Sequence, residues 1–205
     1  MATKEYSCVK RTKAAFENSL IALAKDRPIN KITVKMLCEH AQLSRNAFYF
    51  HYKDINDLIS EIEDGIVNAA LSNFDSFREM GFPKNVRATI VSLIELIDSR
   101  REACGMLLDH SDTFTDRISS AFCDFNYQYF EEYHGKNRVN RAGFDFFYMF
   151  ISNGFYGLLK YWLDNPDKMS KSELIGLTYV LIKRLLVQNN PDIDFTKKKD
   201  GKNDE

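Results

Sequence analysis

Glycine and proline are scarce in this chain, which has only nine and four of them among 205 residues. Turn-rich β architectures need both residues at many positions, so their scarcity favours long helices. No apolar run approaches the ~20 residues that a membrane-spanning helix requires. The first residues, MATKEYSCVKRTKAAF, also lack the apolar region of a signal peptide. We therefore expect a cytoplasmic protein.

Motifs for catalysis and metal binding are missing as well. The sequence contains no Gly-rich phosphate loop, no recognisable nucleophile motif, no CxxC pair and no Cys/His metal-ligand spacing. We predict no enzyme activity, no catalytic residue, no metal site and no cofactor. The scattered cysteines suit small buried apolar residues, and a redox-sensing role for one of them stays open: Cys8, Cys38, Cys104 and Cys123.

The net charge of −1 hides an asymmetry along the chain. Residues 1–53 contain ten basic and four acidic side chains, a net charge of +6, whereas residues 54–189 carry −6. A positive front end on an acidic body indicates that only the front end meets a polyanion. Chance clustering on a solvated surface would give the same count, so charge alone leaves both interpretations open.

Apolar residues recur at helical spacing in about nine segments, and none alternates as a strand does. The sequence therefore predicts an all-α fold. Two of the expected short helices begin after Thr33 and Ser44, whose hydroxyls can cap them, and Ser170 with Glu173 forms a capping box before the last. The expected helices cover residues 5–25, 34–41, 44–50, 54–80, 84–99, 101–109, 113–134, 139–163 and 171–189.

The stretch LSRNAFYFHYKD, residues 43–54, mixes dense aromatics with basic and imidazole groups. Two short helices joined by a turn of three or four residues, the second polar at its start, are the signature of a helix-turn-helix. Such a motif lays its second helix in the major groove of DNA. There, Arg45 can bind guanine and Asn46 can bind adenine, each through two hydrogen bonds. Later residues suit phosphate contacts, which position the helix without reading sequence: Tyr49, His51 and Lys53.

The same short helix needs a buried side, because it could not be stable alone. We expect Leu43, Phe48 and Tyr52 to face inward, while Phe50 fits either side. The polar residues also have simpler explanations. Thr33 and Ser44 can be helix caps only, His51 can be a packed side chain, and Arg45 and Asn46 can belong to a solvated surface.

Residues 8–62 resemble the DNA-binding domain of the TetR family of transcriptional regulators. The resemblance depends on fixed spacings in ITVKMLCEHAQLSRNAFYFHYKDINDLISEI. One departure is Gln42, where the family often has glycine in a turn whose left-handed geometry costs glutamine more. The matching positions are Thr33, Leu37, Ala41, Leu43, Ser44, Phe48, Tyr49, His51, Tyr52, Lys53 and Leu58.

The resemblance implies which side chains contact DNA. Phosphate contacts fall to Thr33, Tyr49, His51 and Lys53, and groove contacts fall to Lys35, Ser44, Arg45 and Asn46. It also implies an organisation: residues 1–53 as the helix-turn-helix domain, 54–80 as a long connecting helix, and 81–189 as an effector-binding and dimerisation domain. The polar, aperiodic tail 190–205 is expected to be disordered.

The segment NGFYGLLKYWLDNPDKMSKSELIGLTYVLI resembles the C-terminal end of one TetR subgroup. By that resemblance, residues 139–163 and 171–189 pair with a second subunit as a four-helix bundle. Gly154 and Gly157 lie on one side of their helix, where another helix can approach closely. The alternative is that both helices pack only within the monomer. A two-fold dimer suits DNA, because two half-sites then mirror the protein's symmetry.

An effector pocket is harder to place. Residues 113–134 and 139–163 are rich in aromatics, which at helical spacing more often form a core than a cavity. A small apolar or aromatic effector would suit a cavity lined by such rings with a few hydroxyls. As a hypothesis, the lining residues are Met106, His110, Phe122, Tyr148 and Tyr156.

These features and the resemblance predict a homodimeric TetR-type regulator of transcription that binds a palindromic operator. That it is a repressor, which a small-molecule effector could release, is what the resemblance to the family implies. Two alternatives remain open. One is an activator, or a regulator of the same fold that responds to a partner protein. The other is an interaction module that keeps the fold and holds another protein.

Overall fold

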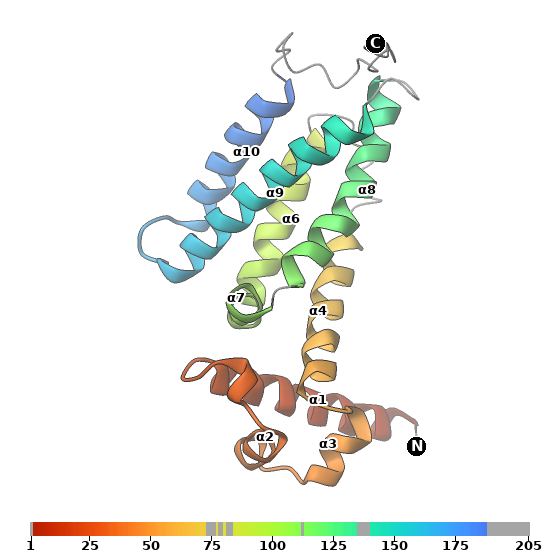
Figure 1. Ribbon diagram of the computed structural model, residues 1–205, viewed down its shortest axis with the longest axis vertical. Helices are drawn as coiled ribbons and strands as arrows, with labels where there is room; N and C mark the ends of the chain where they lie inside the picture. The colour runs from red at the N-terminus through yellow and green to blue at the C-terminus, as the bar shows by residue number, and fades with distance from the viewer. Residues whose placement is uncertain are drawn as a thin grey trace, which may run out of the picture. The chain divides into compact units, whose positions relative to one another are not determined.

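A computed structural model describes residues 2–72, 77, 80, 84–111, 113–134 and 140–187 of the chain (Figure 1). Over these residues it contains nine α-helices, one short 3-10 helix and no strand, which confirms the predicted all-α fold. The contacts divide the chain into a first unit, residues 1–68 with 100–114, and a second unit, residues 69–99 with 115–205. Among the described residues we find no helix with both the length and the apolar character that crossing a membrane requires.

The first unit packs short helices around a long one. Its core is closed by one fully buried side chain from each helix: Phe16, Leu37, Phe48, Leu58 and Leu107. The Phe16 and Phe48 rings meet edge to face, with centroids 5.3 Å apart. The helices are α1 (Ala2–Ala24), α2 (Val34–Ala41), α3 (Arg45–His51), most of α4 (Ile55–Leu71) and α7 (Arg101–His110), with a 3-10 helix at Ile29–Lys31.

Polar contacts join α7 to the helices of the first unit. The guanidinium of Arg100, just before α7, lies 2.5 Å from a carboxylate oxygen of Glu17 on α1. At the other end of α7, the Ser111 hydroxyl donates to Glu63, a carboxylate that is almost completely buried on α4. A buried carboxylate is stabilised only when its oxygens are hydrogen-bonded, so Ser111 contributes directly to holding α7 against α4.

The second unit contains the remaining helices. They are α6 (Lys84–Ser99), α8 (Phe114–His134), α9 (Arg141–Asp164) and α10 (Lys171–Val187). The indole N–H of Trp162 donates to the Met169 carbonyl at 2.9 Å and so ties the end of α9 to the segment before α10. The buried cluster at its centre comprises Ile90, Ile94, Leu159, Trp162 and Leu174.

The predicted caps are confirmed by hydrogen bonds. The Thr33 and Ser44 hydroxyls each accept from the backbone N–H three residues on, at 3.2 and 3.1 Å. The capping box is also formed: the Ser170 N–H donates to Glu173 at 2.8 Å, and the Glu173 N–H donates to the Ser170 hydroxyl at 3.3 Å. These bonds satisfy backbone donors that have no partner within the helix.

Some expectations fall outside the described residues. α4 is described to Leu71, so its expected continuation to residue 80 is covered only in part. The expected break at 81–83 and the tail at 190–205 are not covered. The predicted division into domains stays a prediction.

Candidate DNA-binding surface

The turn between α2 and α3 has a left-handed residue at its centre. Gln42 caps α2 with φ 55° and ψ 38°, the one non-glycine residue with positive φ in the described part of the chain. The next residue, Leu43, donates its N–H to the Cys38 carbonyl at 3.0 Å. The same carbonyl also accepts from the Gln42 N–H, so two donors close the end of α2, and the reversal sets the direction of α3.

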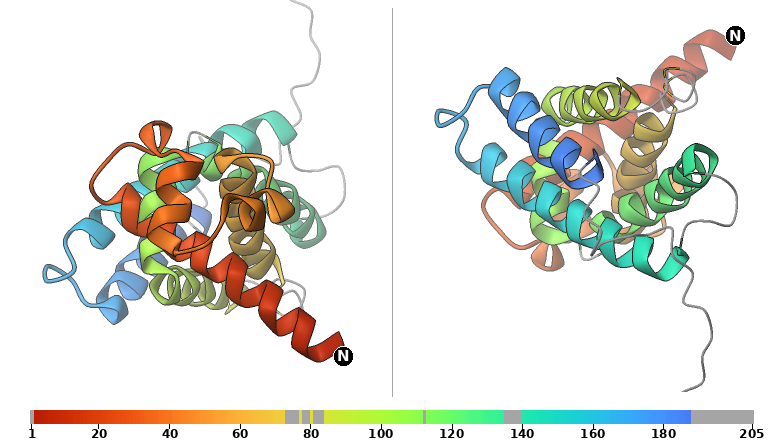
Figure 2. Two further views of the ribbon diagram at one scale, coloured as in Figure 1. Left: turned by 90° about the horizontal axis from the view of Figure 1, so that it is seen from below. Right: turned by 90° about the horizontal axis from the view of Figure 1, so that it is seen from above.

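α3 has a buried side and an exposed side, as the sequence predicts. Phe48 and Tyr52 are buried at 0% and 3% exposure, while the Tyr49 side chain is 59% exposed. Arg45 and Asn46, at the start of the helix, are also exposed. Figure 2 shows α2 and α3 side by side and facing the viewer in the view from below. The exposed side of α3 is therefore free to meet a partner outside this chain.

Tyr52, the C-cap residue of α3, anchors this helix to α1 and α4. Its ring lies 6.3 Å from that of Phe16, and its hydroxyl donates to Glu61 on α4 at 3.4 Å. Burial, together with the nearby Glu61 carboxylate, raises the pKa of Tyr52 well above its usual range. The hydroxyl therefore stays protonated as a hydrogen-bond donor, which links the end of α3 to α4.

The two capping hydroxyls remain available to a partner. Thr33 and Ser44 are exposed, and in their caps both hydroxyl oxygens act only as acceptors. A hydroxyl that accepts one hydrogen bond can still donate another, for example to a phosphate oxygen. Capping and DNA contact are therefore compatible at these two positions.

The remaining predicted DNA-contact residues differ in how easily their side chains can reach a ligand. Lys35 is exposed and lies 3.9 Å from Glu39, a distance at which an exposed pair holds it only weakly. Lys53 is exposed, and its backbone N–H donates to Asp57 at the start of α4. His51 is half-buried, with its ring 5.0 Å from that of Phe50. Of the eight predicted DNA contacts, His51 has the least room to reach a ligand.

Phe50 is the residue that sequence reasoning left unassigned. Its side chain is 80% exposed, and it follows Asn46 by four positions on α3. Residues four apart share a helix side, so the position of Asn46 was the signal that could have placed it. A large exposed apolar ring on this side can meet thymine methyl groups or sugar edges.

The five hypothetical effector residues are divided between the two units. Met106 is buried and His110 exposed in the first unit, and the other three belong to the second. There, the Ser119 hydroxyl lies 3.3 Å from that of Tyr156, whose pKa burial raises to about 12. Burial also raises the pKa of Tyr148. The effector site stays a prediction.

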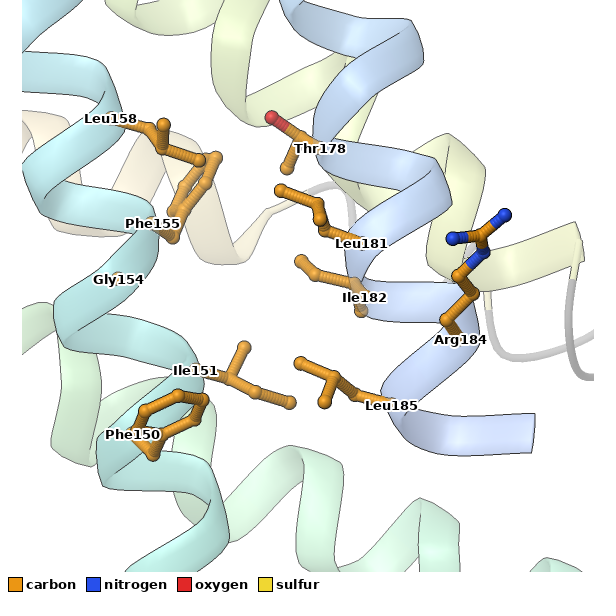
Figure 3. A pocket seen from close by; sticks show the side chains of 10 residues that line it. All are labelled: Phe150, Ile151, Gly154, Phe155, Leu158, Thr178, Leu181, Ile182, Arg184 and Leu185. Carbon is orange, nitrogen blue, oxygen red and sulfur yellow. The ribbon is translucent and has the colours of Figure 1, made fainter. Parts of the chain in front are cut away.

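A cavity of about 540 Å³ lies between α9 and α10 (Figure 3). None of the five hypothetical effector residues lines it. Thr178 does, and its buried hydroxyl oxygen has no hydrogen-bond partner within the described residues. In Figure 3, Ile151 on α9 and Leu185 on α10 point toward each other across the gap. The cavity is almost wholly apolar in its lining.

Beside this cavity, α9 and α10 expose many large apolar side chains. Gly154 and Gly157 on α9 are exposed, and a Cβ added to either would meet no atom within 4 Å. Nothing in the described chain covers this side, which we name the α9–α10 surface. Its exposed apolar residues are Phe146, Met149, Phe150, Tyr161, Leu177, Val180, Leu181 and Leu185.

Comparison with known proteins finds similarity to regulators of transcription. Residues 84–184 match the model of the TetR-type family described as transcriptional regulator C-terminal region. The uncharacterized HTH-type transcriptional regulator YxbF from Bacillus subtilis (strain 168) is 38% identical over 71 residues, which cover 33% of this chain and 18% of that protein.

Solved structures of TetR regulators share the fold. A TetR transcriptional regulator from Streptococcus agalactiae 2603V aligns over 89% of this chain and 99% of its own, with 22% identity and a TM-score of 0.61. A putative TetR-family regulator from Syntrophomonas wolfei str. Goettingen aligns over 88% and 97%, with 13% identity and a TM-score of 0.68. At such identities the likeness shows the fold alone.

Proposed function

This chain belongs to the TetR family of transcriptional regulators, and on that premise we propose that it is a cytoplasmic repressor that binds a palindromic operator as a homodimer. The observation that carries the proposal is the exposed side of α3. A seven-residue helix holds Phe48 and Tyr52 in the core and leaves Arg45, Asn46 and Tyr49 in solvent. That division is what a helix needs to enter the major groove.

The residues on this side divide by the kind of contact they make. Arg45 and Asn46 stand in the first turn of α3, where side chains reach base edges, and they read guanine and adenine respectively. The other contacts position the helix on the backbone without reading sequence. Lys35 and Ser44 border the groove, and the phosphates are held by Thr33, Tyr49, His51 and Lys53.

The α9–α10 surface supports the homodimer. Soluble monomers rarely expose a continuous apolar area of this kind, and such an area marks a site of association. A two-fold axis brings two identical surfaces together so that each contact occurs twice, and the apolar side chains of one copy then cover those of the other. Two copies of α3 would be presented together, and a palindromic operator matches that symmetry.

An effector would act through populations of two dimer states. If it binds the state whose two recognition helices no longer match the spacing of the half-sites, it releases the operator. The effector can shift the equilibrium between the two dimer states by no more than the difference between its binding free energies for them. The hypothetical lining residues Met106, His110, Phe122, Tyr148 and Tyr156 remain the first positions to vary in a search for that site.

The test is selection of bound duplexes from a random DNA pool by the full-length protein. We expect an enriched palindrome whose half-sites contain the bases that Arg45 and Asn46 read. Binding of that duplex should weaken steeply with salt, because each neutralised phosphate releases counterions. A pool that returns no enriched sequence, with no salt-dependent binding of any duplex, would contradict the proposal.

A further inference from the structure

The first half of α1 is not needed to close the core of its unit. α1 runs from Ala2 to Ala24, yet its first buried side chain is Phe16. Between residues 6 and 15 every side chain is exposed or half-buried. A helix of this length draws most of its stability from packing rather than from intrinsic propensity. This segment therefore projects as an arm that the rest of the chain leaves largely uncovered.

Lys13 fixes where this arm lies. Its ammonium nitrogen is 2.6 Å from Glu61 and 5.5 Å from the centre of the Tyr52 ring. Tyr52 is the residue at which α3 ends. Lys10 and Tyr6 precede Lys13 by three and seven positions, so they lie on the same side of α1, about 4.5 and 10 Å farther along its axis.

The figures show the same arrangement within the first unit. In Figure 1 the N-terminal end of α1 extends past α3 and slopes toward its level. In the view from below, this end of α1 again projects beyond α2 and α3 (Figure 2). A duplex bound along α3 would therefore continue beneath the arm.

The charge on the arm has no partner in the described chain. Lys10 and Arg11 are both exposed, and neither forms an ion pair with a described carboxylate. Lys13 on the same helix and Lys25 just after its end are both paired with carboxylates, Glu61 and Glu102. Tyr6 adds a hydroxyl donor at 72% exposure. Two cations with no ion pair among the described residues and a phenol are donors that suit phosphate oxygens.

We propose that this exposed arm of α1, with Tyr6 and Lys10 on the side of Lys13 and the long side chain of Arg11 next to Lys10, is a second DNA-binding surface that holds the sugar-phosphate backbone beyond the stretch under α3. The inference rests on the proposed function and deepens it. A duplex presents a phosphate for every ~1.7 Å of its axis, so any DNA that α3 binds offers charge at the arm as well. These contacts add affinity without adding sequence preference.

The experiment compares two double variants of the full-length protein on the duplex that the wild type selects. Lys10→Ala/Arg11→Ala removes the two arm charges. Lys84→Ala/Arg87→Ala is the control: it removes two exposed charges from α6 in the other unit and changes the net charge equally. Affinity is measured across a series of salt concentrations, and ethylation interference maps the contacted phosphates.

The slope of log K against log salt is negative, and we expect the arm variant to reduce its magnitude by about 2. This is close to one for each phosphate that the two side chains neutralise in the wild type. Its affinity should fall about tenfold or more at ~0.1 M salt, equally for the selected duplex and for unrelated DNA. The selected sequence should not change. Interference should disappear only at phosphates outside the stretch under α3, whereas the control should keep the wild-type slope and pattern.

If the arm variant has the same slope and interference pattern as the control, this inference is wrong. The proposed function would still hold in that case, provided that the wild-type protein selects a palindrome. If the wild type itself selects no DNA, the proposed function fails, and this inference fails with it. The helix content of each variant, measured by circular dichroism, shows whether a change in binding comes from misfolding. Both arm side chains are exposed and alanine favours helix, so the variant should keep its helix content.

Discussion

Arg45 and Tyr49 are one turn apart on the exposed side of α3, yet they should contribute differently to binding. A guanidinium that binds guanine through two hydrogen bonds discriminates between bases by about 1–3 kcal/mol. We therefore expect Arg45→Ala to weaken binding of the selected operator by that amount and to relax the preference at one base pair of each half-site. Repeating the random-pool selection with this variant measures both effects.

Tyr49→Phe provides the contrast, because it removes only a hydroxyl. Loss of a hydrogen bond to phosphate should weaken binding of all duplexes to the same extent and leave the selected sequence unchanged. The salt slope should also stay the same, since the phenol is neutral and releases no counterion. If Tyr49→Phe alters the sequence preference, or Arg45→Ala does not, the assigned roles of the two residues are wrong.

Gln42 carries a conformational cost that can be measured. A left-handed backbone costs a residue with a Cβ roughly 1–2 kcal/mol. Glycine avoids this strain, but its greater conformational freedom in the unfolded chain lowers the stability by roughly 0.5–1 kcal/mol. We expect Gln42→Gly to raise the stability of the first unit by about 0.5–1 kcal/mol. In thermal unfolding, this corresponds to an increase of about 2 °C in the midpoint.

Gln42→Ala is the matched control, because alanine keeps a Cβ and so keeps the strain at φ 55°. It should give no increase in the midpoint. A lower midpoint for Gln42→Gly than for Gln42→Ala would contradict this prediction, because it would show that glycine's freedom in the unfolded chain outweighs the left-handed strain that a Cβ imposes.

The aromatic residues of α3 show how far sequence could resolve single positions. Phe48 and Tyr52 were predicted to be buried, and they are, because their four-residue spacing turns both rings toward Phe16 on α1. Phe50 could not be assigned from its own identity, since an aromatic ring usually belongs in a core. Only its four-residue spacing from Asn46 places it on the exposed side.

At the scale of elements, helix ends were predictable where a side chain or a turn defines them. α2 runs from Val34 to Ala41, the bounds expected from the Thr33 cap and the turn at Gln42. The docking of α7 in the first unit was not predictable. Arg100 and Glu17 lie 83 positions apart, and no local pattern in either helix encodes that pairing. Long-range contacts of this kind depend on the assembled fold rather than on propensity.

The start of α10 offers a test of an element whose cap was predicted. The Ser170 hydroxyl accepts from the Glu173 N–H at 3.3 Å and donates to the Glu173 carboxylate at 2.7 Å, which holds the pKa of that carboxyl below its usual value. Replacing a capping serine by alanine costs about 1 kcal/mol. We expect Ser170→Ala to lower the free energy of unfolding by about that amount in a denaturant titration.

Ser170→Thr keeps the hydroxyl, so it should lower the free energy of unfolding much less than Ser170→Ala does. Leu174 is fully buried beside Trp162 in the core of the second unit, so fraying of the first turn of α10 would loosen that core as well. Equal stability for the wild type and Ser170→Ala would mean that the hydrogen bonds of the capping box contribute nothing measurable to α10.

For the whole molecule, the α9–α10 surface leads to a prediction about assembly. We expect the purified protein to sediment at twice the 23.8 kDa of one chain. Gly154→Leu should shift it toward the monomer. No described atom lies within 4 Å of the added Cβ, so the substitution begins in open space in the single chain, where a leucine would obstruct a helix approaching from a second copy. Sedimentation equilibrium gives the dissociation constant directly.

Gly65→Leu is the matched control, because Gly65 on α4 is also an exposed helical glycine with nothing within 4 Å of its added Cβ. Both changes improve helix propensity equally, so a difference in assembly must come from the surface and not from folding. Gly154→Leu should also bind the selected palindrome more weakly than Gly65→Leu does, because two linked copies of α3 bind as one ligand with a high effective concentration. If Gly154→Leu dimerises as tightly as Gly65→Leu, the two chains do not meet closely at this point of α9, and the homodimer would have to form through another surface.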